Sequence, residues 1–522
     1  MKRWMSAAVT IGVVLSGLSL VSPGAMGPGA GGGGEVSQDL NRWARDTWQS
    51  LAAMTDEGTG LPADHISGDL ETSSAYTSPT NIGGYLWSTV TARDLGIIGT
   101  DEARDRMSTT LDTLAGLERN DASGMFYNWY SPTTGEKLTS WPGSGDPVHP
   151  FLSTVDNGWL AAALRIVREA EPQLADEADA LYDSMDFAAF FDPAGAAGLA
   201  AGTNRGGFWE TAPPECSVAA PMYNGSGEIA HYTCHHYDTT VSESRIATYL
   251  GIANGQIPAT ALYGTRRTMP PGCDWAWQEQ VPQGEYRTYD GVDVWEGAYR
   301  YAGMSFVPSW GGSMFESLMP DLLVPETSWG PTSWGLNHPI TVAVQEQHGL
   351  DEAGYGYWGF SPASNPFGGY AEYGVDVAGI RSDGYTSDVE RTDVDIDRTG
   401  CAAGANPAPE FGDGVVTPHA SFLALPYDRA GVLSNLRGIE DDLGGYGLGG
   451  FYDAVAVRSG TISEQYLSLD QSMIMAAIGN ELTGDSLKDY FVDSDMRERL
   501  RPAMRQQHFG SSWGEGGDGC EG

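Results

Sequence analysis

Apolar residues recur at helical spacing along most of the chain. Near the N-terminus, Leu40, Trp43, Ala44, Trp48 and Leu51 follow one another mainly at intervals of three or four residues, which places them on one face of a helix. The same period predicts helices over 80–94, 102–117, 154–170, 173–190, 239–254, 313–319, 337–349, 417–438 (one or two helices), 467–482 and 485–504. We therefore expect a protein built from roughly a dozen helices.

Long segments without helical periodicity separate these helices. Examples are 202–238 and 268–312, which are rich in Gly, Pro, Ser and aromatic residues. Such segments are too long for a simple helical bundle, and long loops on a rigid scaffold commonly carry function. No low-complexity linker interrupts 37–505, so we expect a single all-α domain there, an (α/α)6 toroid or barrel with long loops and minor β-ribbons. Residues 506–522 are predicted to form a Gly-rich tail.

The first residues carry the pattern of a secretory signal. Lys2 and Arg3 precede an apolar run over 7–20, and small residues follow at 25–27. The run is shorter than the roughly 20 residues that cross a bilayer. We expect residues 1–27 to be a cleaved signal peptide, 28–36 to be a Gly-rich leader, and the protein to be secreted without a membrane span.

The net charge of the chain limits the kinds of molecule that the protein is expected to bind. Lys and Arg number 28 against 69 Asp and Glu, and the formal net charge is −41. This charge repels nucleic acids and anionic lipid surfaces, although it could also serve only for solubility. The chain also has 16 Trp and 24 Tyr, whose flat apolar faces and polar edges suit sugar rings. A neutral oligo- or polysaccharide is therefore the expected partner, bound by a monomer.

Cysteine and acidic clusters were weighed as structural or metal sites. Five cysteines in an exported chain allow two disulfides and one free thiol: Cys216, Cys234, Cys273, Cys401 and Cys520. Cys216 and Cys234 share one loop-rich stretch, so we predict that they pair. The group His231, Cys234, His235 and His236 has no second pair of ligands at helical spacing, and the acidic run over 388–397 lacks the Gly of an EF-hand loop. We predict no metal site.

Carboxylates are better candidates for chemistry, because cleavage of a glycosidic bond needs two of them facing one pocket. Glu243 lies three residues before Ile246 and seven before Leu250, which puts it on the apolar stripe of the predicted helix over 239–254. It could instead cap the helix or pair with Arg245. Since a helix start favours the ionised form, desolvation must prevail if Glu243 is to act as an acid.

Two further acids stand beside apolar helical stripes. Asp156 begins the predicted helix over 154–170, where it could be an N-cap or a catalytic carboxylate. Glu316 lies among apolar neighbours in 313–319, where it could contact substrate or pair with an Arg.

Five segments carry a family likeness: 77–83 (TSPTNIG), 155–160 (VDNGWL), 237–245 (Tyr-Asp followed by SESR), 358–374 (WGFSPASNP through YAEYG) and 450–473 (GFYDA with LDQSM). In this order, over about residues 38–492, they resemble the glucoamylase-like domain family. That family includes the endo-β-1,2-glucanases of glycoside hydrolase family 144 and is related to segments of cyclic β-1,2-glucan synthases. Two Cys-bearing insertions, 202–234 and 387–413, depart from the family pattern and are expected to reshape the pocket rim.

The resemblance implies an (α/α)6 barrel, no cofactor, and hydrolysis of a glucan with inversion. It places Glu243 at the position of an essential acid and Asp156 in a segment that carries essential Asp residues. The residues expected to contact the substrate are Arg245, Asn157, Trp159, Asp238, Glu316, Trp358, Tyr370, Glu372, Tyr373, Tyr452 and Asp453.

The sequence thus predicts an inverting glycoside hydrolase, with a β-1,2-linked glucan as the first choice of substrate. Its catalytic carboxylates are Glu243, as acid or as orienting group, and Asp156, as base. The alternatives are a phosphorylase or transglycosylase on the same scaffold, and a secreted glycan-binding protein without activity.

Overall fold

A computed structural model describes residues 32–223, 225, 227–270, 280–380 and 411–514 of the chain. The predicted signal peptide, the acidic run over 388–397, and Cys273, Cys401 and Cys520 lie outside these residues.

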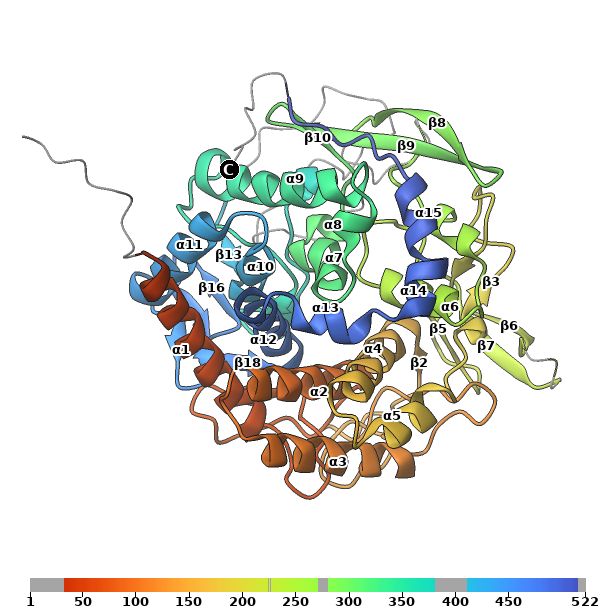
Figure 1. Ribbon diagram of the computed structural model, residues 1–522, viewed down its shortest axis with the longest axis horizontal. Helices are drawn as coiled ribbons and strands as arrows, with labels where there is room; N and C mark the ends of the chain where they lie inside the picture. The colour runs from red at the N-terminus through yellow and green to blue at the C-terminus, as the bar shows by residue number, and fades with distance from the viewer. Residues whose placement is uncertain (1–31, 224, 226, 271–279, 381–410, 515–522) are drawn as a thin grey trace, which may run out of the picture.

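Helices are the main regular structure of the described chain, and Figure 1 shows them arranged in a ring. In the first half they are α1 (Gly32–Ala53), α2 (Pro79–Asp94), α3 (Thr100–Gly116), α4 (Thr154–Ala170), α5 (Ala175–Tyr182) and α6 (Arg245–Ala253). In the second half they are α7 (Met314–Leu318), α8 (Glu326–Trp329), α9 (Trp334–Glu346), α10 (Pro418–Leu423), α11 (Arg429–Asp441), α12 (Ser468–Thr483), α13 (Ser486–Phe491), α14 (Ser494–Arg499) and α15 (Arg501–Gln506). The prediction of a helix-rich protein is confirmed.

Helix α2 lies between α4 and α12, with α3 against its outer side. It is buried along nearly its whole length, which explains why it lacks one dominant apolar face. Two glycines permit the close packing. A Cβ at Gly83 would lie 2.9 Å from the carbonyl oxygen of Trp159 on α4, and a Cβ at Gly84 would lie 2.5 Å from Oγ of Ser472 on α12.

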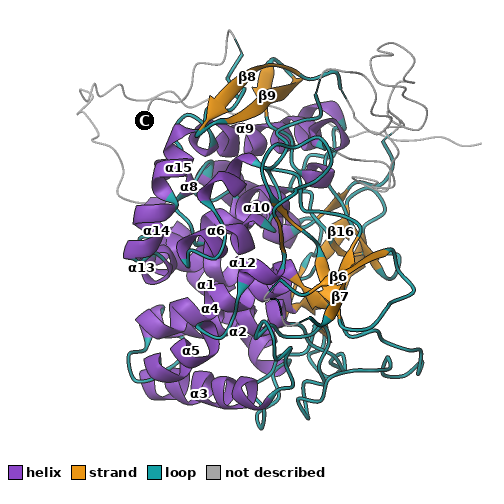
Figure 2. Cartoon of the chain, turned by 90° about the vertical axis from the view of Figure 1, so that its right-hand side faces the viewer, coloured by secondary structure: helices purple, strands orange, loops and turns teal. Residues whose placement is uncertain are grey.

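The strands form small antiparallel sheets in the loops; in Figure 2, β8 and β9 lie at the top of the helices, and β6, β7 and β16 lie beside them. One sheet has the order β2-β5-β7-β6, from β2 (Leu152–Ser153), β5 (Gly207–Trp209), β7 (Ile229–Thr233) and β6 (Ser217–Pro221). Two three-stranded sheets are β10-β9-β8, from β10 (Met304–Phe306), β9 (Val292–Tyr301) and β8 (Gln283–Tyr289), and β13-β16-β17, from β13 (Val415–Val416), β16 (Ala454–Ala456) and β17 (Thr461–Ser463). The two-stranded pairs are β1 (His65–Ser67) with β18 (Gln465–Leu467), β3 (Phe191–Asp192) with β4 (Thr203–Asn204), β11 (Ala363–Ser364) with β12 (Tyr370–Ala371), and β14 (Tyr446–Gly447) with β15 (Gly450–Phe451).

Three predicted helices have different bounds in the structure. The helix expected over 173–190 ends at Tyr182, and the one expected over 239–254 begins only at Arg245. The segment 485–504 is divided into α13, α14 and α15, because Asp493 leaves the helix and its side chain accepts a hydrogen bond from the N–H of Met496. Pro502 is the second residue of α15, in the first turn, where its missing N–H costs nothing.

The predicted Gly-rich tail is packed where it is described. Phe509 is buried against Trp334 in a small apolar cluster, and its N–H donates to the carbonyl of Thr332 at 3.0 Å. Ser512 exchanges two backbone hydrogen bonds of 2.8 Å with Ser305 beside β10. The prediction of a tail starting at residue 506 is therefore wrong for 507–514, since an apolar anchor holds that segment to the domain.

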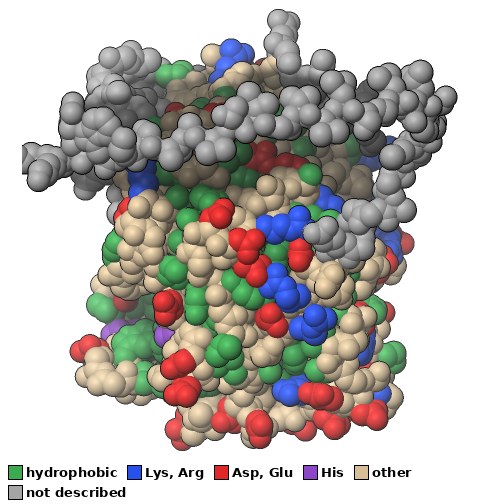
Figure 3. All heavy atoms as spheres, turned by 90° about the vertical axis from the view of Figure 1, so that its left-hand side faces the viewer, with side chains coloured by type: hydrophobic (Ala, Val, Ile, Leu, Met, Phe, Trp, Pro, Cys, Tyr) green, Lys and Arg blue, Asp and Glu red, His purple; other side chains and the backbone are tan. Residues whose placement is uncertain are grey.

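The surface agrees with a chain rich in acids. On the face drawn in Figure 3, Asp and Glu side chains are scattered rather than gathered in one patch. Among the described residues, no helix is long and apolar enough to cross a membrane.

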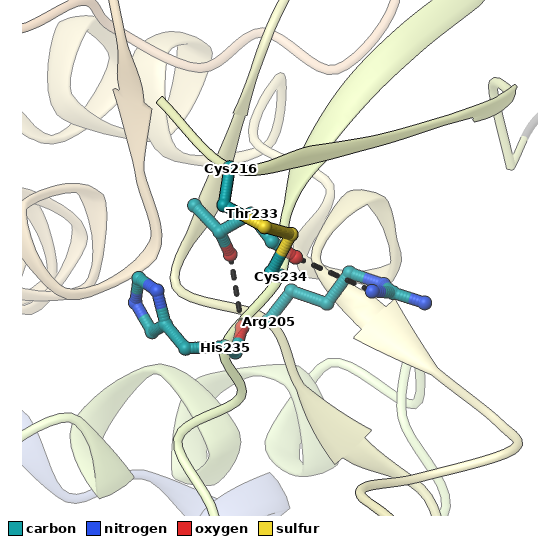
Figure 4. The surroundings of a disulfide bond; sticks show 5 residues. All are labelled: Arg205, Cys216, Thr233, Cys234 and His235. Carbon is teal, nitrogen blue, oxygen red and sulfur yellow. Dashed lines mark hydrogen bonds between the residues drawn. A yellow bond between two sulfur atoms is a disulfide. The ribbon is translucent and has the colours of Figure 1, made fainter. Parts of the chain in front are cut away.

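The predicted disulfide between Cys216 and Cys234 is confirmed, and it ties the start of β6 to the end of β7 (Figure 4). Just beside it, Thr233 Oγ1 donates to the carbonyl of His235 at 2.9 Å, and Arg205 donates to the carbonyl of Thr233 at 3.4 Å. The bridge and these bonds fix the segment that follows Cys234.

Candidate active site

A cavity of about 990 Å³ is lined by residues from the helical ring and from the loops that connect its helices. Residues at or just before the N-termini of α2, α4, α6, α7 and α12 contribute to its wall. The positive ends of these helix dipoles therefore meet there, and this favours negative charge in the cavity. Its acidic wall residues are Asp64, Asp156, Asp238, Glu243, Glu316 and Glu372. Its aromatic wall residues are Tyr76, Trp129, Trp141, Trp159, Tyr237, Trp310, Phe315 and Tyr370.

Glu243 lies in a turn that precedes α6, not on a helical stripe as its spacing predicted. The prediction was wrong because the first helical residue is Arg245, and an apolar spacing of three and seven residues does not mark where the helix starts. The Glu243 carboxylate accepts a hydrogen bond from the indole N–H of Trp159 on α4. Its backbone N–H donates to Oε2 of Glu316 at 2.8 Å. Glu243 is thus held from two sides.

The environment of Glu243 raises the pKa of its carboxyl well above the ordinary value. Burial is the main cause, and the nearby carboxyls of Glu316 and Asp156 add to it. The Trp159 hydrogen bond and the charge of Arg245 act in the opposite direction but do not prevail. Desolvation therefore outweighs the helix start and favours the protonated form of Glu243, which is the form that a general acid needs.

Glu316 supports Glu243 from α7. Its side chain is buried, and burial raises the pKa of its carboxyl to about 7, although the N–H of Glu243, a hydrogen bond from Ser242 and the charge of Arg245 oppose the rise. No side-chain ion pair joins Glu316 to an Arg within the described chain, because the guanidinium of Arg245 reaches only its backbone carbonyl, at 2.8 Å. Glu316 is therefore the neighbour that orients Glu243.

Asp156 lies in the first turn of α4, partly exposed to the same cavity. Ser153 is the N-cap of this helix and accepts the N–H of Asp156 at 3.3 Å, so the carboxylate of Asp156 is not needed as a cap. Its Oδ1 instead accepts a hydrogen bond from Thr80 Oγ1 at 2.7 Å. Asp156 is thus directed by α2 and remains available to the cavity.

Tyr237 shows that the three carboxyl groups converge. Burial raises the pKa of its hydroxyl well above the ordinary value, and the charges of Glu243, Asp156 and Glu316 raise it further, in that order. The phenol of Tyr237 therefore shares one cavity wall with the three acids, lies within reach of their charges, and remains a hydrogen-bond donor at physiological pH.

The structure separates the predicted substrate residues into two groups. Those in the cavity wall, together with Glu243 and Asp156, are Trp159, Asp238, Glu316, Tyr370 and Glu372. Tyr370 is 55 % exposed and Glu372 is also exposed, so both are open to a ligand, while Asp238 is partly exposed and accepts a hydrogen bond from Arg266 at 3.2 Å. Those absent from the wall are Arg245, Asn157, Trp358, Tyr373, Tyr452 and Asp453.

Arg245 is a structural residue, and this corrects its predicted role in lining a sugar site. All five of its N–H groups are used. Two go to Glu326, at 2.6 and 2.8 Å, and the others to the carbonyls of Ser242, Glu316 and Ser317. Burial opposes ionisation of Glu326, yet Arg245 lowers the pKa of this fully buried carboxyl to about 2. A buried ion pair with every donor satisfied leaves nothing to offer a ligand.

Asn157 is likewise committed to the protein. It is fully buried, and its amide exchanges hydrogen bonds with both backbone groups of Phe126, at 2.8 and 2.9 Å, and donates to the carbonyl of Ser153. It ties the loop before Trp129 to the start of α4, so its predicted contact with substrate is corrected to a positioning role.

Trp358, Tyr373 and Tyr452 also pack inside the protein instead of lining the cavity. Trp358 belongs to the main apolar core and Tyr373 to a smaller apolar cluster beside it, whereas Tyr452 stacks on Tyr466 with ring centres 5.4 Å apart. Their predicted sugar contacts are corrected, since an aromatic residue in sequence does not reveal whether its face points to a core or to a cavity.

Asp453 belongs to a buried polar cluster behind the cavity. Its carboxylate accepts the N–H of Ser364 at 2.7 Å, and it interacts with Asp470. Burial and the charge of Asp470 raise the pKa of Asp453 well above its ordinary range, and burial raises the pKa of Asp470 to about 8. His419 lies 3.1 Å from Asp470, and burial lowers its pKa to about 4. The predicted sugar contact of Asp453 is corrected to a role within this cluster.

Several wall residues escaped the sequence prediction. They are Asp64, Tyr76, Thr80, Trp129, Trp141, Tyr237 and Trp310. Tyr237 could have been found, because it precedes Asp238 in a segment that carries the family likeness. Trp129 and Trp141 lie in loops without helical periodicity. The only sequence signal for them was the large number of aromatic residues in the chain.

One buried group of side chains elsewhere has the composition of a metal site. Ligand atoms of Asp321, Glu326 and His338 lie within 4.8 Å of one another. Arg245 already neutralises Glu326, and Lys488 lies 3.7 Å from Asp321. These fixed cations satisfy the acids, so the residues present do not call for a metal ion.

Comparison with known proteins agrees with the fold and confirms the resemblance seen in the sequence. Residues 278–494 match the Glycoamylase family model, described as "Putative glucoamylase", and 42–199 match a second family model, described as a protein of unknown function. The cyclic β-(1,2)-glucan synthase NdvB of Rhizobium meliloti (strain 1021) is 25 % identical over 559 residues, covering 88 % of this chain. The chain spans only 18 % of the length of that relative.

Solved structures show the same architecture. An endo-β-1,2-glucanase from Chitinophaga pinensis, in complex with sophorotriose and glucose, matches with a TM-score of 0.60 and 16 % identity, over 90 % of this chain and 98 % of that one. A β-1,2-glucanase from Parabacteroides distasonis matches with a TM-score of 0.62 and 14 % identity, over 90 % and 60 % of the two chains. A mutant endo-β-1,2-glucanase from Talaromyces funiculosus, in complex with β-1,2-glucan, matches with a TM-score of 0.57 and 12 % identity, over 90 % of each chain. At these identities the likeness shows the fold.

Proposed function

We propose that the protein is a secreted glycoside hydrolase that cleaves a β-1,2-linked glucan with inversion of the anomeric centre. One observation carries this proposal. Glu243 lies in a cavity wall where burial raises the pKa of its carboxyl, and the same wall bears the partly exposed side chain of Asp156. Two acids in unequal environments are the arrangement by which a glycosidic bond is protonated on one side and attacked by water on the other.

The proposed reaction uses side chains of the protein alone. Glu243 gives its proton to the glycosidic oxygen as the bond between that oxygen and the anomeric carbon breaks. Asp156 takes a proton from a water molecule, whose oxygen forms the new bond to the anomeric carbon from the opposite face. Because Trp159 donates to Oε2 of Glu243, the proton to be transferred belongs on Oε1. For direct activation of the water, the two carboxyl groups must lie about 6.5 to 9.5 Å apart with substrate bound.

Three finer features belong to the same proposal. We assign the helical ring to the (α/α)6 class, which is consistent with inner helices α2, α4 and α12 and outer helices such as α3 and α5. The β-1,2 linkage is favoured because the solved structures of similar fold named above include glucanases with this specificity. Release through a cleaved signal peptide rests on the N-terminal sequence pattern.

The decisive experiment is a screen of linear glucans with β-1,2, β-1,3, β-1,4 and α-1,4 linkages, in which NMR follows the anomer of the first product. We expect cleavage of the β-1,2 series with an inverted anomer. The variants Glu243→Gln and Asp156→Asn should each lose roughly 10²–10⁴-fold in kcat while still binding glucan. The variant Asp495→Asn, which changes an exposed carboxylate on α14 outside the cavity wall, is the matched control and should keep kcat.

Other outcomes would replace this proposal. A retained anomer would exclude inversion. A requirement for phosphate, or products longer than the substrate, would indicate a phosphorylase or a transglycosylase. Glucan binding with no turnover, unchanged by Glu243→Gln, would indicate a binding protein.

A further inference from the structure

Three aromatic rings form a cluster in the cavity wall that the proposed chemistry does not use. The centre of the Tyr76 ring lies 5.3 Å from that of Trp129 and 5.4 Å from that of Trp141, and it meets both at 80°. The two tryptophan rings lie 5.9 Å apart, tilted at 50°. All three residues line the cavity, and all three are partly exposed.

The backbone holds these rings in place before any ligand arrives. Tyr76 precedes Thr77, which exchanges two backbone hydrogen bonds with Tyr130. The carbonyl of Trp129 accepts the N–H of Leu138 at 2.8 Å, and Trp141 is held in a turn by two bonds, of 2.8 and 2.9 Å. Prearranged rings lose little conformational freedom when they bind, which favours affinity.

Core packing does not account for the cluster. Most of the large aromatic residues that are fully buried belong to the apolar core of the domain, whereas Tyr76, Trp129 and Trp141 contact one another outside it. The indoles of Trp43 and Trp87 donate to Glu440 and to the carbonyl of Ser472. In the part of the chain that the structure describes, no hydrogen bond satisfies the indole N–H of Trp129 or Trp141. A flat face beside a free donor is what a sugar ring with hydroxyl groups requires.

Polar groups connect this cluster to the reacting carboxylates. The charge of Asp64 helps to raise the pKa of the nearby Tyr76 hydroxyl, and Oδ1 of Asp64 accepts a hydrogen bond from Asn81 at 3.0 Å. Asn81 follows Thr80 on α2, and Thr80 bonds Asp156. The aromatic cluster therefore lines the same cavity as Glu243 and Asp156, and residues at the start of α2 connect it to Asp156.

We propose that Tyr76, Trp129 and Trp141 form a stacking subsite for a pyranose ring of the glucan, at a distance from the bond that is cleaved. This proposal rests on the proposed function, because it places another part of the same substrate. A subsite of this kind selects for chain length. A glucan long enough to reach from Glu243 to the rings binds more tightly than a short one, while a disaccharide at the carboxylates does not contact the rings.

The test measures binding and turnover separately, with linear β-1,2-glucooligosaccharides of increasing length as probes. Calorimetry on the Glu243→Gln variant gives affinity, and the active chain gives kcat and KM. Trp129→Ala and Trp141→Ala should each weaken binding of long oligosaccharides roughly tenfold and raise their KM, with kcat nearly unchanged. Binding of the disaccharide should not change. Trp129→Phe keeps a flat ring and should restore most of the affinity.

Trp513→Ala is the matched control, since Trp513 is 41 % exposed and lies outside the cavity wall. Circular dichroism and the melting temperature establish that each variant is folded. If glucans are cleaved but both alanine variants keep their affinity at every length, the subsite is wrong while the proposed function stands. If no glucan is cleaved but long glucans bind through Trp129 and Trp141, the subsite stands while the proposed function fails. Absence of any glucan binding overturns both.

Discussion

The N–H of Glu243 and Oε2 of Glu316 are joined by a hydrogen bond of 2.8 Å, which couples the proposed acid to a second buried carboxyl. The contact fixes the turn that carries Glu243, and it also sets the electrostatics. Each negative charge that forms on Glu316 makes ionisation of Glu243 harder.

Removal of the Glu316 charge should move the pH profile. A general acid works only while protonated, so activity falls as pH rises through the pKa of Glu243. In Glu316→Gln the amide oxygen can still accept the N–H, but the repulsion is lost. We expect the basic limb of kcat/KM to shift to lower pH by roughly one unit.

Measurement of kcat/KM from acid to alkaline pH checks this expectation. Asp238→Asn is the control, because Asp238 lines the same cavity but is not among the main groups that raise the pKa of Glu243. Its basic limb should stay in place. A limb in Glu316→Gln that remains fixed or moves to higher pH would contradict the coupling.

The buried cluster of Asp470, Asp453 and His419 should make stability depend on pH. The pKa of Asp470 is about 8 in the folded protein and about 3.9 in an unfolded chain. A raised carboxyl pKa gives a contribution that is fully present below the unfolded value and is lost as pH rises to the folded one. We therefore expect the free energy of unfolding to fall between about pH 4 and about pH 8 by an amount that Asp470→Asn reduces.

Urea unfolding of both chains at several pH values in this window provides the measurement. Asp495→Asn, at the start of the surface helix α14, is the control and should leave the slope unchanged. The interpretation fails if the free energy of unfolding falls by the same amount in the wild type and in Asp470→Asn over this pH range.

The packing of α2 against α4 should be sensitive to a single methyl group. In Gly83→Ala the new Cβ would lie 2.9 Å from the backbone oxygen of Trp159, which cannot move alone. We expect destabilisation by about 1–3 kcal/mol. In Gly116→Ala, near the end of α3, the Cβ meets nothing within 4 Å, and stability should rise by about 0.5–1 kcal/mol. Chemical denaturation measures both changes. Equal changes in the free energy of unfolding for the two variants would exclude the steric explanation.

The disulfide should matter more for substrate binding than for chemistry. Cys234 and the residues after it line the cavity, whereas Trp159 and Glu243 are carried by α4 and the turn before α6. In the double variant Cys216→Ser and Cys234→Ser, or after reduction, we expect KM to rise severalfold with little change in kcat. A closed loop with a separation of 18 residues should also contribute about 2–4 kcal/mol of stability.

Steady-state kinetics and urea unfolding with and without reductant check both parts. Reductant should raise the KM and lower the free energy of unfolding of the wild type. It should leave both quantities unchanged in the double variant. A fall in kcat at constant KM would show that the bridge serves the reacting carboxylates instead.

Sequence periodicity located most helices because burial imposes a repeat of 3.6 residues on any helix that covers a core. It failed at helix ends, as at Glu243 and Asp493, where one side chain or one turn decides the boundary. The family likeness located Glu243 and Asp156, and apolar neighbours singled out Glu316, in segments that prove to meet at one cavity. It could not separate Tyr370, which faces that cavity, from Tyr373, which is buried three residues later.

By itself, the sequence determined an acidic chain with helical periodicity and a small set of carboxyl groups suited to sugar chemistry, whereas the pairing of Cys216 with Cys234 was one choice among several until the structure showed it. Only the tertiary structure decided which of these side chains share a cavity. It directs Arg245 inward to Glu326, and it assembles Tyr76, Trp129 and Trp141 from separate loops. The physical reason is that a helical repeat depends on residues close in sequence. The cavity, by contrast, is formed by helix ends and loops that meet only when the chain has packed.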